Sequence, residues 1–416
     1  MKIAKAARIW LTRSLKPFEF KNQYNNQLNY TDVDGLGLYI HIPFCKSICN
    51  FCPYCKTIYN EQMASRYIKA LLKEIELVGQ SISTKKEVTS MYFGGGSPAL
   101  LVDHLGEIIT AVKKYFIINE GIGVELHPDD VTIETLSKLK TAGVSKISIG
   151  IQSFQQTYLS VLGRKQIDYS SMFEALREVP FTTVSMDLIF AIPGQTADSL
   201  KQDIAFAFVN GANHIAIYPF VDFSFSGNTL LPMTEKDKRT LLDSITEYCE
   251  KNGYVRTSIW TYSKNASIKY SSMTRDNFLG FGCSATTLLT DQFKINTFAI
   301  EDYIDRLEQG QLSTSLTLRF TPRQRMVYYL FWTAYTTSID PKAFRKFFGV
   351  SLHSKYGFEL YLCRLLGFVK KENGIYRMTG KGAYYYYYFE QFYTLAYIDK
   401  MWGIMREKAF PERIKL

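Results

Sequence analysis

Long apolar runs and histidines are both scarce in this chain, and each shortage argues against a class of protein. None of the apolar runs in its 416 residues reaches the roughly 20 residues that cross a bilayer, so we expect a soluble or peripheral protein. Only five histidines occur, and His41 alone lies beside the cysteine cluster described below. A metal site built mainly from histidine is therefore disfavoured.

Acidic residues are absent from the first fifteen positions, which carry Lys2, Lys5, Arg8 and Arg13. This segment also lacks the long apolar core of a secretory signal. We expect an ordinary surface helix here and a cytoplasmic protein. A transit peptide and a basic amphipathic helix lying over a site or a membrane surface stay open as alternatives.

The composition, with 46% hydrophobic and 21% charged residues, is that of a globular protein that buries a substantial core. The formal net charge of +10 means that the surface attracts anions. An acidic electron-donor protein, a carboxylate-rich substrate, a nucleic acid or an anionic membrane would each suit this charge. The charge alone does not choose among them.

Strands and helices alternate from residue 36 to about 220. The short apolar segments predicted as strands are Leu36–Ile42, Ser90–Gly94, Ile122–Leu126, Lys146–Ile151, Val184–Phe190 and His214–Tyr218. The helices predicted between them are Glu61–Gly79, Asp103–Tyr115, Thr132–Ala142 and Asp198–Val209. This alternation indicates a parallel sheet, either open and doubly wound or closed into a partial TIM-like barrel, with the chemistry at the carboxyl ends of the strands.

The segment after about Thr321 has a different pattern. Helices are predicted at Arg323–Ala334, Pro341–Phe348 and Leu352–Leu366, before a hairpin whose turn is Asn373-Gly374. Three helices and a hairpin are the outline of a winged helix. A tyrosine-rich helix, Ala383–Met405, follows and is expected to fill a domain interface. Since a fold does not carry function by itself, we expect no nucleic-acid partner.

Four of the seven cysteines lie within eleven residues, which is typical of a metal site in a reducing compartment. Cys45, Cys49 and Cys52 have the spacing C-x3-C-x2-C, which lets three thiolates hold one face of a cubane iron–sulfur cluster. Three ligands leave one iron open to the amino and carboxylate groups of a small molecule. A structural zinc site with Cys55 as the fourth ligand is the alternative.

Five further motifs accompany the cysteines: YFGGGSP at 92–98, ISIGIQSF at 147–154, LGR at 162–164, DLIFAIPGQT at 187–196 and LGFGCSA at 279–285. With them, the chain resembles the radical S-adenosylmethionine (SAM) family of oxygen-independent coproporphyrinogen III oxidase and its relatives. The resemblance implies a partial (β/α)6 TIM-like barrel. It also implies a 4Fe–4S cluster on Cys45, Cys49 and Cys52, with SAM on the open iron and reduced flavodoxin or ferredoxin as electron donor.

The resemblance divides the chain and assigns roles to its residues. The expected parts are an N-terminal arm (1–35), the barrel (36–220), an extension with a second-ligand region (221–320) and a helical, winged-helix-like domain (321–416). Tyr39 and Phe51 are expected beside the cluster as the catalytic side chains. The expected SAM-binding residues are Gly94, Gly95, Gly96, Ser97, Glu125, Gln152, Arg164 and Asp187, and a second SAM is expected, if at all, at Gly282, Ser284 and Ala285.

The remaining cysteines are expected to bind no metal. Cys55 departs from the nearest family spacing by one residue, and we predict a partly exposed thiol there. Cys283 is predicted to be a small packing residue. Cys249 and Cys363 lie on apolar helix faces and are predicted to be core.

The family's reactions include propionate decarboxylation, two-SAM methyl transfer, cyclopropanation and haem ring opening, besides a haem-chaperone role. Residues 262–279 lack the histidine- and tryptophan-containing signature of the chaperone, and the run Tyr384–Tyr388 does not resemble the porphyrin decarboxylase. We therefore predict two-SAM methylation or cyclopropanation of a small organic substrate, with tetrapyrrole chemistry second and a haem chaperone third. We expect a monomer and leave open a peripheral contact with a membrane.

Overall fold

The computed structural model describes residues 2–23, 28–225, 231–268, 270 and 276–416. Its centre is a run of parallel strands: β2 (Leu36–Ile42), β6 (Met91–Gly95), β8 (Ile122–Leu126), β9 (Lys146–Gln152), β10 (Thr183–Phe190) and β11 (His214–Pro219). Each lies within one residue of its predicted bounds. Most of their residues are buried, as expected of parallel strands covered on both faces.

The barrel is partial, because its two outer strands find other partners instead of each other. β2 pairs in parallel with β14 (Asn277–Phe281), and β11 pairs antiparallel with β13 (Thr261–Ser263), which carries β12 (Val255–Arg256). The sequence pattern left an open sheet and a partial barrel as alternatives. The partial barrel implied by the family resemblance is confirmed.

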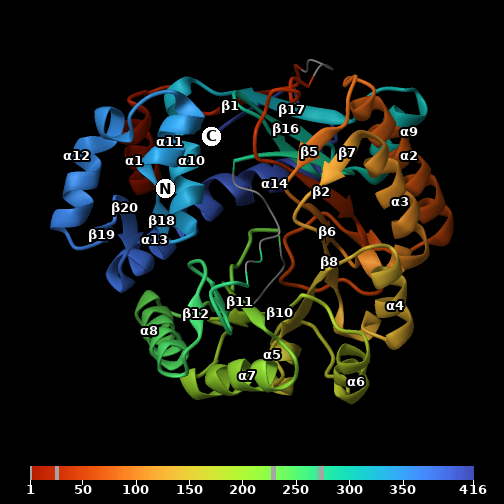
Figure 1. Cartoon of the computed structure of the whole chain (residues 1–416), viewed down its shortest axis with the longest axis horizontal. Coiled ribbons are helices and arrows are strands. Elements are labelled where there is room, and N and C mark those ends of the chain that lie inside the picture. Colours follow the sequence, from red (N-terminus) through yellow and green to blue (C-terminus); the bar gives the residue numbers. More distant parts are fainter. Residues whose placement is uncertain (1, 24–27, 226–230, 269, 271–275) are drawn as a thin grey trace.

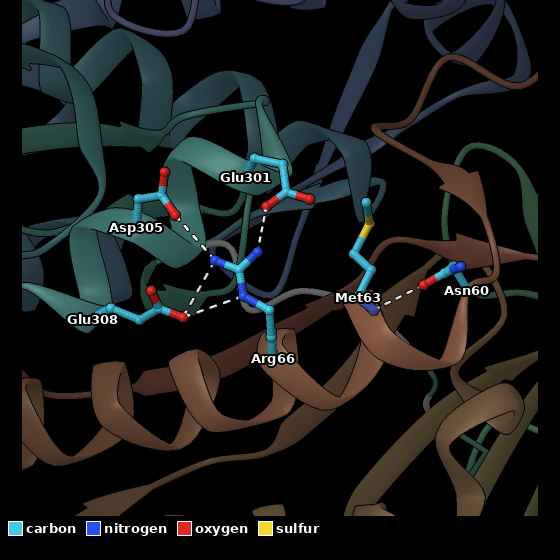
Figure 2. A network of polar contacts seen from close by, with 6 residues as sticks. All are labelled: Asn60, Met63, Arg66, Glu301, Asp305 and Glu308. Carbon is cyan, nitrogen blue, oxygen red and sulfur yellow. Dashed lines mark hydrogen bonds and ion pairs between the residues drawn. The ribbon is translucent and has the colours of Figure 1, made fainter.

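Helices follow the strands and form an outer arc around them (Figure 1). They are α2 (Glu61–Gly79), α3 (Val102–Tyr115), α4 (Ile133–Thr141), α5 (Gln156–Val161), α6 (Ser170–Glu178), α7 (Ala197–Val209) and α8 (Glu235–Lys251). Local chemistry sets where they begin. Thr196 caps α7 in a reciprocal capping box with Ser199, and the Asn60 side chain accepts from the Met63 amide at 3.0 Å to start α2 (Figure 2).

An antiparallel extension continues the sheet beyond β14. It consists of β15 (Thr286–Leu288), β16 (Gln292–Asn296), β17 (Thr314–Arg319), β1 (Glu19–Lys21) and β21 (Arg413–Lys415). The two ends of the chain therefore meet, since β1 pairs with both β17 and β21. The expected arm and the last residues of the expected C-terminal domain share this sheet, and the domain boundaries remain a prediction.

The C-terminal helices and hairpin have the predicted winged-helix order. Its elements are α10 (Pro322–Tyr335), β18 (Ser338–Ile339), α11 (Pro341–Phe348), α12 (Leu352–Leu365), β19 (Val369–Glu372) and β20 (Ile375–Met378). Asn373 and Gly374 both have positive φ, 50° and 85°, as the two-residue hairpin turn requires. The N-terminal helix α1 (Lys2–Thr12) packs on α10 and α13 (Gly380–Tyr393) at this side of the molecule (Figure 1).

The tyrosine run on α13 fills an interface, as expected. Tyr387 is fully buried, with ring centroids 5.0 Å from Trp260 and 5.8 Å from Phe190 at the end of β10. A π-helical turn (Thr394–Ile398) joins α13 to α14 (Asp399–Glu407), which runs toward the barrel. The C-terminal unit is therefore packed against the parallel strands rather than tethered to them.

One arginine of α2 contacts three carboxylates of the helix α9 (Ile300–Glu308) (Figure 2). The Arg66 guanidinium lies 2.9 Å from Glu301, 3.1 Å from Asp305 and 3.3 Å from Glu308. All four side chains are solvent-exposed, so water and salt screen the network and its contribution to stability is small.

Candidate metal and SAM site

The three motif cysteines lie on one loop after β2. β3 (Phe44–Cys45) pairs with β4 (Thr57–Ile58) and closes this loop at its base. Burial raises the pKa of the Cys45 thiol to about 12, and the neighbouring Cys52 and Cys49 thiols add to the rise. Thiols that affect one another in this way lie near one another, so the loop gathers three soft ligands in one place.

Arg164 contacts the cysteine loop directly. Its Nε donates to the Cys49 sulfur at 3.3 Å, its guanidinium lies 5.5 Å from the centroid of the Phe51 ring, and it also donates to the Gly150 carbonyl. The expected fork for a SAM carboxylate therefore lies beside the second cysteine. Phe51, expected next to the cluster, stacks under this cation.

The glycine loop approaches the cysteines so closely that side chains would not fit. A Cβ on Gly96 would lie 2.9 Å from the Cys45 sulfur and 2.4 Å from the Phe44 carbonyl oxygen. Gly95 has φ +118°, and a Cβ there would lie 2.6 Å from the His41 ring. Both the conformation and the contacts therefore require glycine, which supports the expectation that this loop exposes backbone to a ligand.

Glu125 and Tyr39 meet at the same loop. The Gly95 amide donates to Glu125 Oε2 at 3.1 Å, and a Cβ on Gly94 would lie 2.9 Å from that oxygen and 3.1 Å from the Tyr39 ring. Burial raises the pKa of Glu125, and the Gly95 amide opposes the rise. The structure thus brings together residues from β2, β6 and β8, and all three pairs are 30 or more positions apart in the chain.

Ser97 has a different contact from the expected one. Its hydroxyl donates to Asp130, whose other carboxylate oxygen accepts from Lys46 at 2.6 Å. Lys46 follows Cys45 in the chain, so Ser97, Asp130 and Lys46 connect the glycine loop, the end of β8 and the cysteine loop. The geometry gives Ser97 a positioning contact, and its contact with SAM remains a prediction.

Gln152 is the last residue of β9, and Asp187 lies within the next strand, β10. Gln152 has φ +70°, a left-handed conformation rare for a residue with a side chain, at the point where the β9–β10 register shifts. Asp187 accepts from Ser148 at 2.8 Å and from Ser185 at 3.2 Å. Burial raises the pKa of Asp187 to about 7, with the charge of Glu125 as a smaller cause, so the two carboxylates face the same interior.

Several tyrosines around these carboxylates were not predicted as site residues. The Tyr92 hydroxyl lies 2.6 Å from that of Tyr270, and burial raises the pKa of both well above the usual range, with Glu125 and Asp187 among the further causes. Burial also raises the pKa values of Tyr54 and Tyr218, and the charge of Asp187 adds to both rises. Tyr92 lies inside the YFGGGSP motif and could have been named, whereas no pattern marks Tyr270, which lies between positions outside the described residues.

Cys55 points away from the other three motif cysteines. Its thiol donates to the Phe298 carbonyl at 3.2 Å and lies 4.0 Å from the Cys283 sulfur. His41 completes this group: its Nε2 donates to the Cys55 carbonyl at 2.8 Å, so its Nδ1 accepts from Tyr39 at 3.1 Å. The prediction of a partly exposed Cys55 is wrong, because the thiol is buried against the β14–β15 turn, and this orientation argues against zinc held by all four cysteines.

Of the other three cysteine predictions, two are confirmed and one is wrong. Cys283 and Cys249 are fully buried, as expected of packing residues. Cys363 is only half-buried, so its assignment to the core is wrong. It lies in the outer half of α12, where the helix faces solvent with several apolar side chains.

In the region expected for a second SAM, the backbone amides donate hydrogen bonds to other groups of the chain. The Gly282 amide donates to the buried Glu74 of α2 at 2.7 Å, the Ser284 amide to Thr297 at 2.7 Å and the Ala285 amide to Gly282 at 3.3 Å. Each expected backbone donor therefore already has a partner. Binding of a second SAM at this turn remains a prediction.

The end of the chain covers the cysteine loop. Arg406 of α14 donates to the carbonyls of Pro53 and Tyr54, the latter at 3.0 Å, and the Trp402 ring lies 5.9 Å from Tyr54. These two α14 residues contact the loop between the third and fourth cysteines. The sequence predicts a separate C-terminal domain, and no local pattern indicates its contact with this loop.

The donor set fits an iron–sulfur cluster better than a single ion. Among the described residues, the three potential ligands whose atoms lie within 4.8 Å of one another are His41, Cys55 and Cys283, not the motif cysteines. A cubane separates its thiolate ligands more widely than one ion does. Cys45, Cys49 and Cys52 would thus hold the cluster, beside the glycines, carboxylates and arginine that suit an amino acid bound to the open iron.

Comparison with known proteins agrees with this geometry. Residues 39–207 match the family model of the radical SAM superfamily. The chain is 28% identical to the heme chaperone HemW of Bacillus subtilis over 76% of this chain and 87% of that protein, and 25% identical to the oxygen-independent coproporphyrinogen III oxidase of Pseudomonas aeruginosa over 67% of each. The solved structure of coproporphyrinogen III oxidase (HemN) from Escherichia coli superposes with a TM-score of 0.75 at 19% identity, over 92% of this chain and 97% of that one.

The barrel and its cysteine loop define a radical SAM protein, and that class implies a 4Fe–4S cluster and SAM. Within the superfamily, the chain is similar to the oxygen-independent coproporphyrinogen III oxidase-like proteins, among them HemN and HemW. The family resemblance drawn from the motifs is confirmed. In the described part of the chain, no helix combines the length and the apolar character needed to cross a bilayer.

Proposed function

We propose that this protein cleaves SAM reductively and uses the resulting radical on a tetrapyrrole. The observation that carries the proposal is the convergence of Tyr39, Glu125 and Arg164 on the cysteine and glycine loops. The tetrapyrrole substrate class is inferred from the printed functions of the relatives, which are a coproporphyrinogen oxidase and a haem chaperone. When bound, a 4Fe–4S cluster supplies the electron that breaks the SAM sulfonium.

The chain's own residues have separable tasks in this proposal. Cys45, Cys49 and Cys52 hold the cluster, and the Arg164 guanidinium keeps a positive charge against Cys49. The glycine loop presents backbone at close range, and Glu125 is available to accept from an ammonium. Burial raises the pKa of Asp187 to about 7, so this carboxyl can hold or release a proton near neutral pH.

Two-SAM methylation or cyclopropanation, expected from the sequence, is less well supported than tetrapyrrole chemistry. Neither the oxidase nor the chaperone among the relatives carries a methyltransferase name. The turn expected for the second SAM also uses its backbone donors within the chain. We therefore propose one SAM at the cluster.

A haem-chaperone role is the second candidate. The similarity to HemW covers 87% of that protein, whereas the match to the oxidase covers 67% of the oxidase. The signature absent from residues 262–279 argued against the chaperone, although residues 269 and 271–275 lie outside the described residues. The chaperone role predicts tight haem binding without turnover.

The deciding experiment is anaerobic. The cluster is reconstituted and reduced, SAM is added with and without coproporphyrinogen III, and the nucleosides and porphyrins are identified by mass spectrometry. 5′-Deoxyadenosine together with decarboxylated porphyrinogen supports the proposal. S-adenosylhomocysteine with methylated product would establish methylation instead. Haem retention with neither nucleoside product would favour the chaperone.

A further inference from the structure

The net charge of this protein is concentrated in one part of the chain. Residues 321–416 contain sixteen lysines and arginines but only seven aspartates and glutamates, and residues 1–21 contain six and one. Together these two segments carry +14, whereas the rest of the chain carries −4. They are also neighbours in space, because α1 packs on α10 and α13 (Figure 1). The rest of the chain, which includes the barrel, is close to neutral. Residues 1–21 and 321–416, which we call the accessory unit, are strongly basic.

The same unit exposes a row of large apolar side chains. On α12, Phe358, Tyr361 and Leu365 are 57%, 60% and 69% exposed, and their spacing of three and four residues places them on one face. Trp10 of α1 is 53% exposed, and its ring lies 6.3 Å from that of Phe358. We call these four residues the α1–α12 face. Single exposed apolar side chains are ordinary, but a row of four aromatic and aliphatic ones is not.

Cations border the α1–α12 face. Arg13 lies over the Trp10 ring, 4.7 Å from its centroid, and pairs with Glu359. Arg364 on α12 and Lys370 and Lys371 on the wing strand β19 are exposed. Large rings that reach outward between lysines and arginines match the chemistry of a bilayer interface, where rings enter the headgroup layer and cations meet phosphates.

We propose that the α1–α12 face docks this protein on a membrane surface that contains anionic phospholipid. The contact is peripheral and independent of the function proposed above. A strongly basic unit repels a second copy of itself, which disfavours dimerisation through this face. Sequence-reading winged helices present polar side chains to base edges, whereas the outer face of α12 presents Phe358, Tyr361 and Leu365.

The test uses the full chain with its cluster and two kinds of vesicle, phosphatidylcholine alone and phosphatidylcholine mixed with phosphatidylglycerol. Sedimentation should recover the protein with the anionic vesicles, less with them at high salt, and little with the neutral ones. Equal recovery with both vesicles, or with neither, would overturn the proposal.

Two double variants test the face and two matched variants control for it. Phe358→Ser/Leu365→Ser should remove most of the binding. Lys370→Gln/Lys371→Gln should weaken it about 25-fold, since each cation near an anionic surface is worth roughly a fivefold change. Ile117→Ser/Val209→Ser and Lys113→Gln/Lys114→Gln change equally exposed residues of the barrel and should bind as wild type.

The readouts separate docking from misfolding and from other partners. All four double variants should keep wild-type circular dichroism and iron content. The proposal would be overturned if a barrel double variant lowered vesicle binding as much as the α12 or β19 double variant that it matches. A concentration-dependent dimer abolished by Phe358→Ser/Leu365→Ser, without vesicle binding, would assign the face to self-association. Salt-sensitive DNA binding without vesicle binding would assign it to nucleic acid.

Discussion

Cys45 and Cys55 are ten positions apart and have different neighbours. Cys45 lies against Gly96 and near Cys49 and Cys52, whereas Cys55 hydrogen-bonds to Phe298 and contacts Cys283. Between them, the carbonyls of Pro53 and Tyr54 accept from Arg406. Two thiols of one motif therefore have different surroundings, as expected if only the first three cysteines hold the cluster.

At the residue scale, we expect Cys45→Ala, Cys49→Ala and Cys52→Ala each to abolish the cluster, because three thiolates are the minimum set. Cys55→Ala should keep most of it. The measurement is iron and acid-labile sulfide per chain after anaerobic reconstitution. Cys363→Ala, on α12, is the matched control. A full cluster in Cys49→Ala would contradict the ligand assignment.

Asp187 should make stability depend on pH. Burial raises its pKa from 3.8 to about 7, so between these values the folded state holds a proton that the unfolded state has lost. The free energy of unfolding therefore falls as pH rises through this window and is level above it. From about pH 5 to about pH 8, the loss due to Asp187 is about 3 kcal/mol.

Asp187→Asn should remove this part of the pH dependence. The check is urea unfolding of wild type and variant at both pH values. Glu125, whose pKa is also raised, stays in both proteins, and its interaction with Asp187 is part of the measured difference. If the free energy of unfolding changed equally with pH in wild type and Asp187→Asn, Asp187 would have an ordinary pKa in the folded state.

At the scale of elements, α2 is joined to the segment from β14 to α9 by two sets of polar contacts of different kinds. Glu74 is buried and accepts from Gly282, Asn296 and Tyr303 at 2.7–2.8 Å. Arg66 contacts three carboxylates on α9, all in solvent (Figure 2). The number of partners is similar, but only the buried carboxylate leaves unpaired donors behind when it is removed.

We therefore expect Glu74→Ala to lower the free energy of unfolding by about 3 kcal/mol, since it orphans a buried amide and two side-chain donors. Arg66→Ala should have a far smaller effect, and one that shrinks further in high salt. Denaturant titrations at low and high salt measure both. If Arg66→Ala lowered the free energy of unfolding as much as Glu74→Ala, the exposed network would contribute more to stability than solvent-screened ion pairs are expected to.

At the scale of the whole molecule, α14 closes the cysteine loop from the opposite end of the chain. Trp402 contacts Tyr54 and Phe298, with ring centroids 5.9 Å and 6.2 Å apart. These contacts shield one side of a loop whose three motif cysteines are otherwise partly exposed. They also connect the C-terminal unit to the site without adding a ligand.

Trp402→Ala should accordingly keep cluster assembly but speed its loss in air several-fold. The decay of the iron–sulfur absorbance after exposure to oxygen measures the rate. Trp10→Ala changes an exposed tryptophan remote from the loop and should decay as wild type. Failure of Trp402→Ala to assemble a cluster at all would instead assign α14 a role in folding the loop.

Local patterns predicted the six parallel strands well because each is a short buried run bounded by turns, whereas the choice of a partial barrel over an open sheet came from the family resemblance. β2, α2 and α11 match their predicted bounds at both ends. The wing hairpin was predicted for a similar reason, since Asn373-Gly374 has a strong local preference. The antiparallel extension was not predicted: β1 and β21 are three residues each and pair across nearly the whole chain.

The sequence by itself determined which residues are the candidate ligands, because the spacing of Cys45, Cys49 and Cys52 and the run of glycines at 94–96 are local patterns. Tertiary structure alone decided which thiol turns away, which amides are already paired, and that Tyr270 and Trp402 join the site. These outcomes depend on contacts between residues more than a hundred positions apart, such as Cys55 with Cys283 and Arg406 with Tyr54. Such contacts form only when the whole core packs, and no local pattern encodes them.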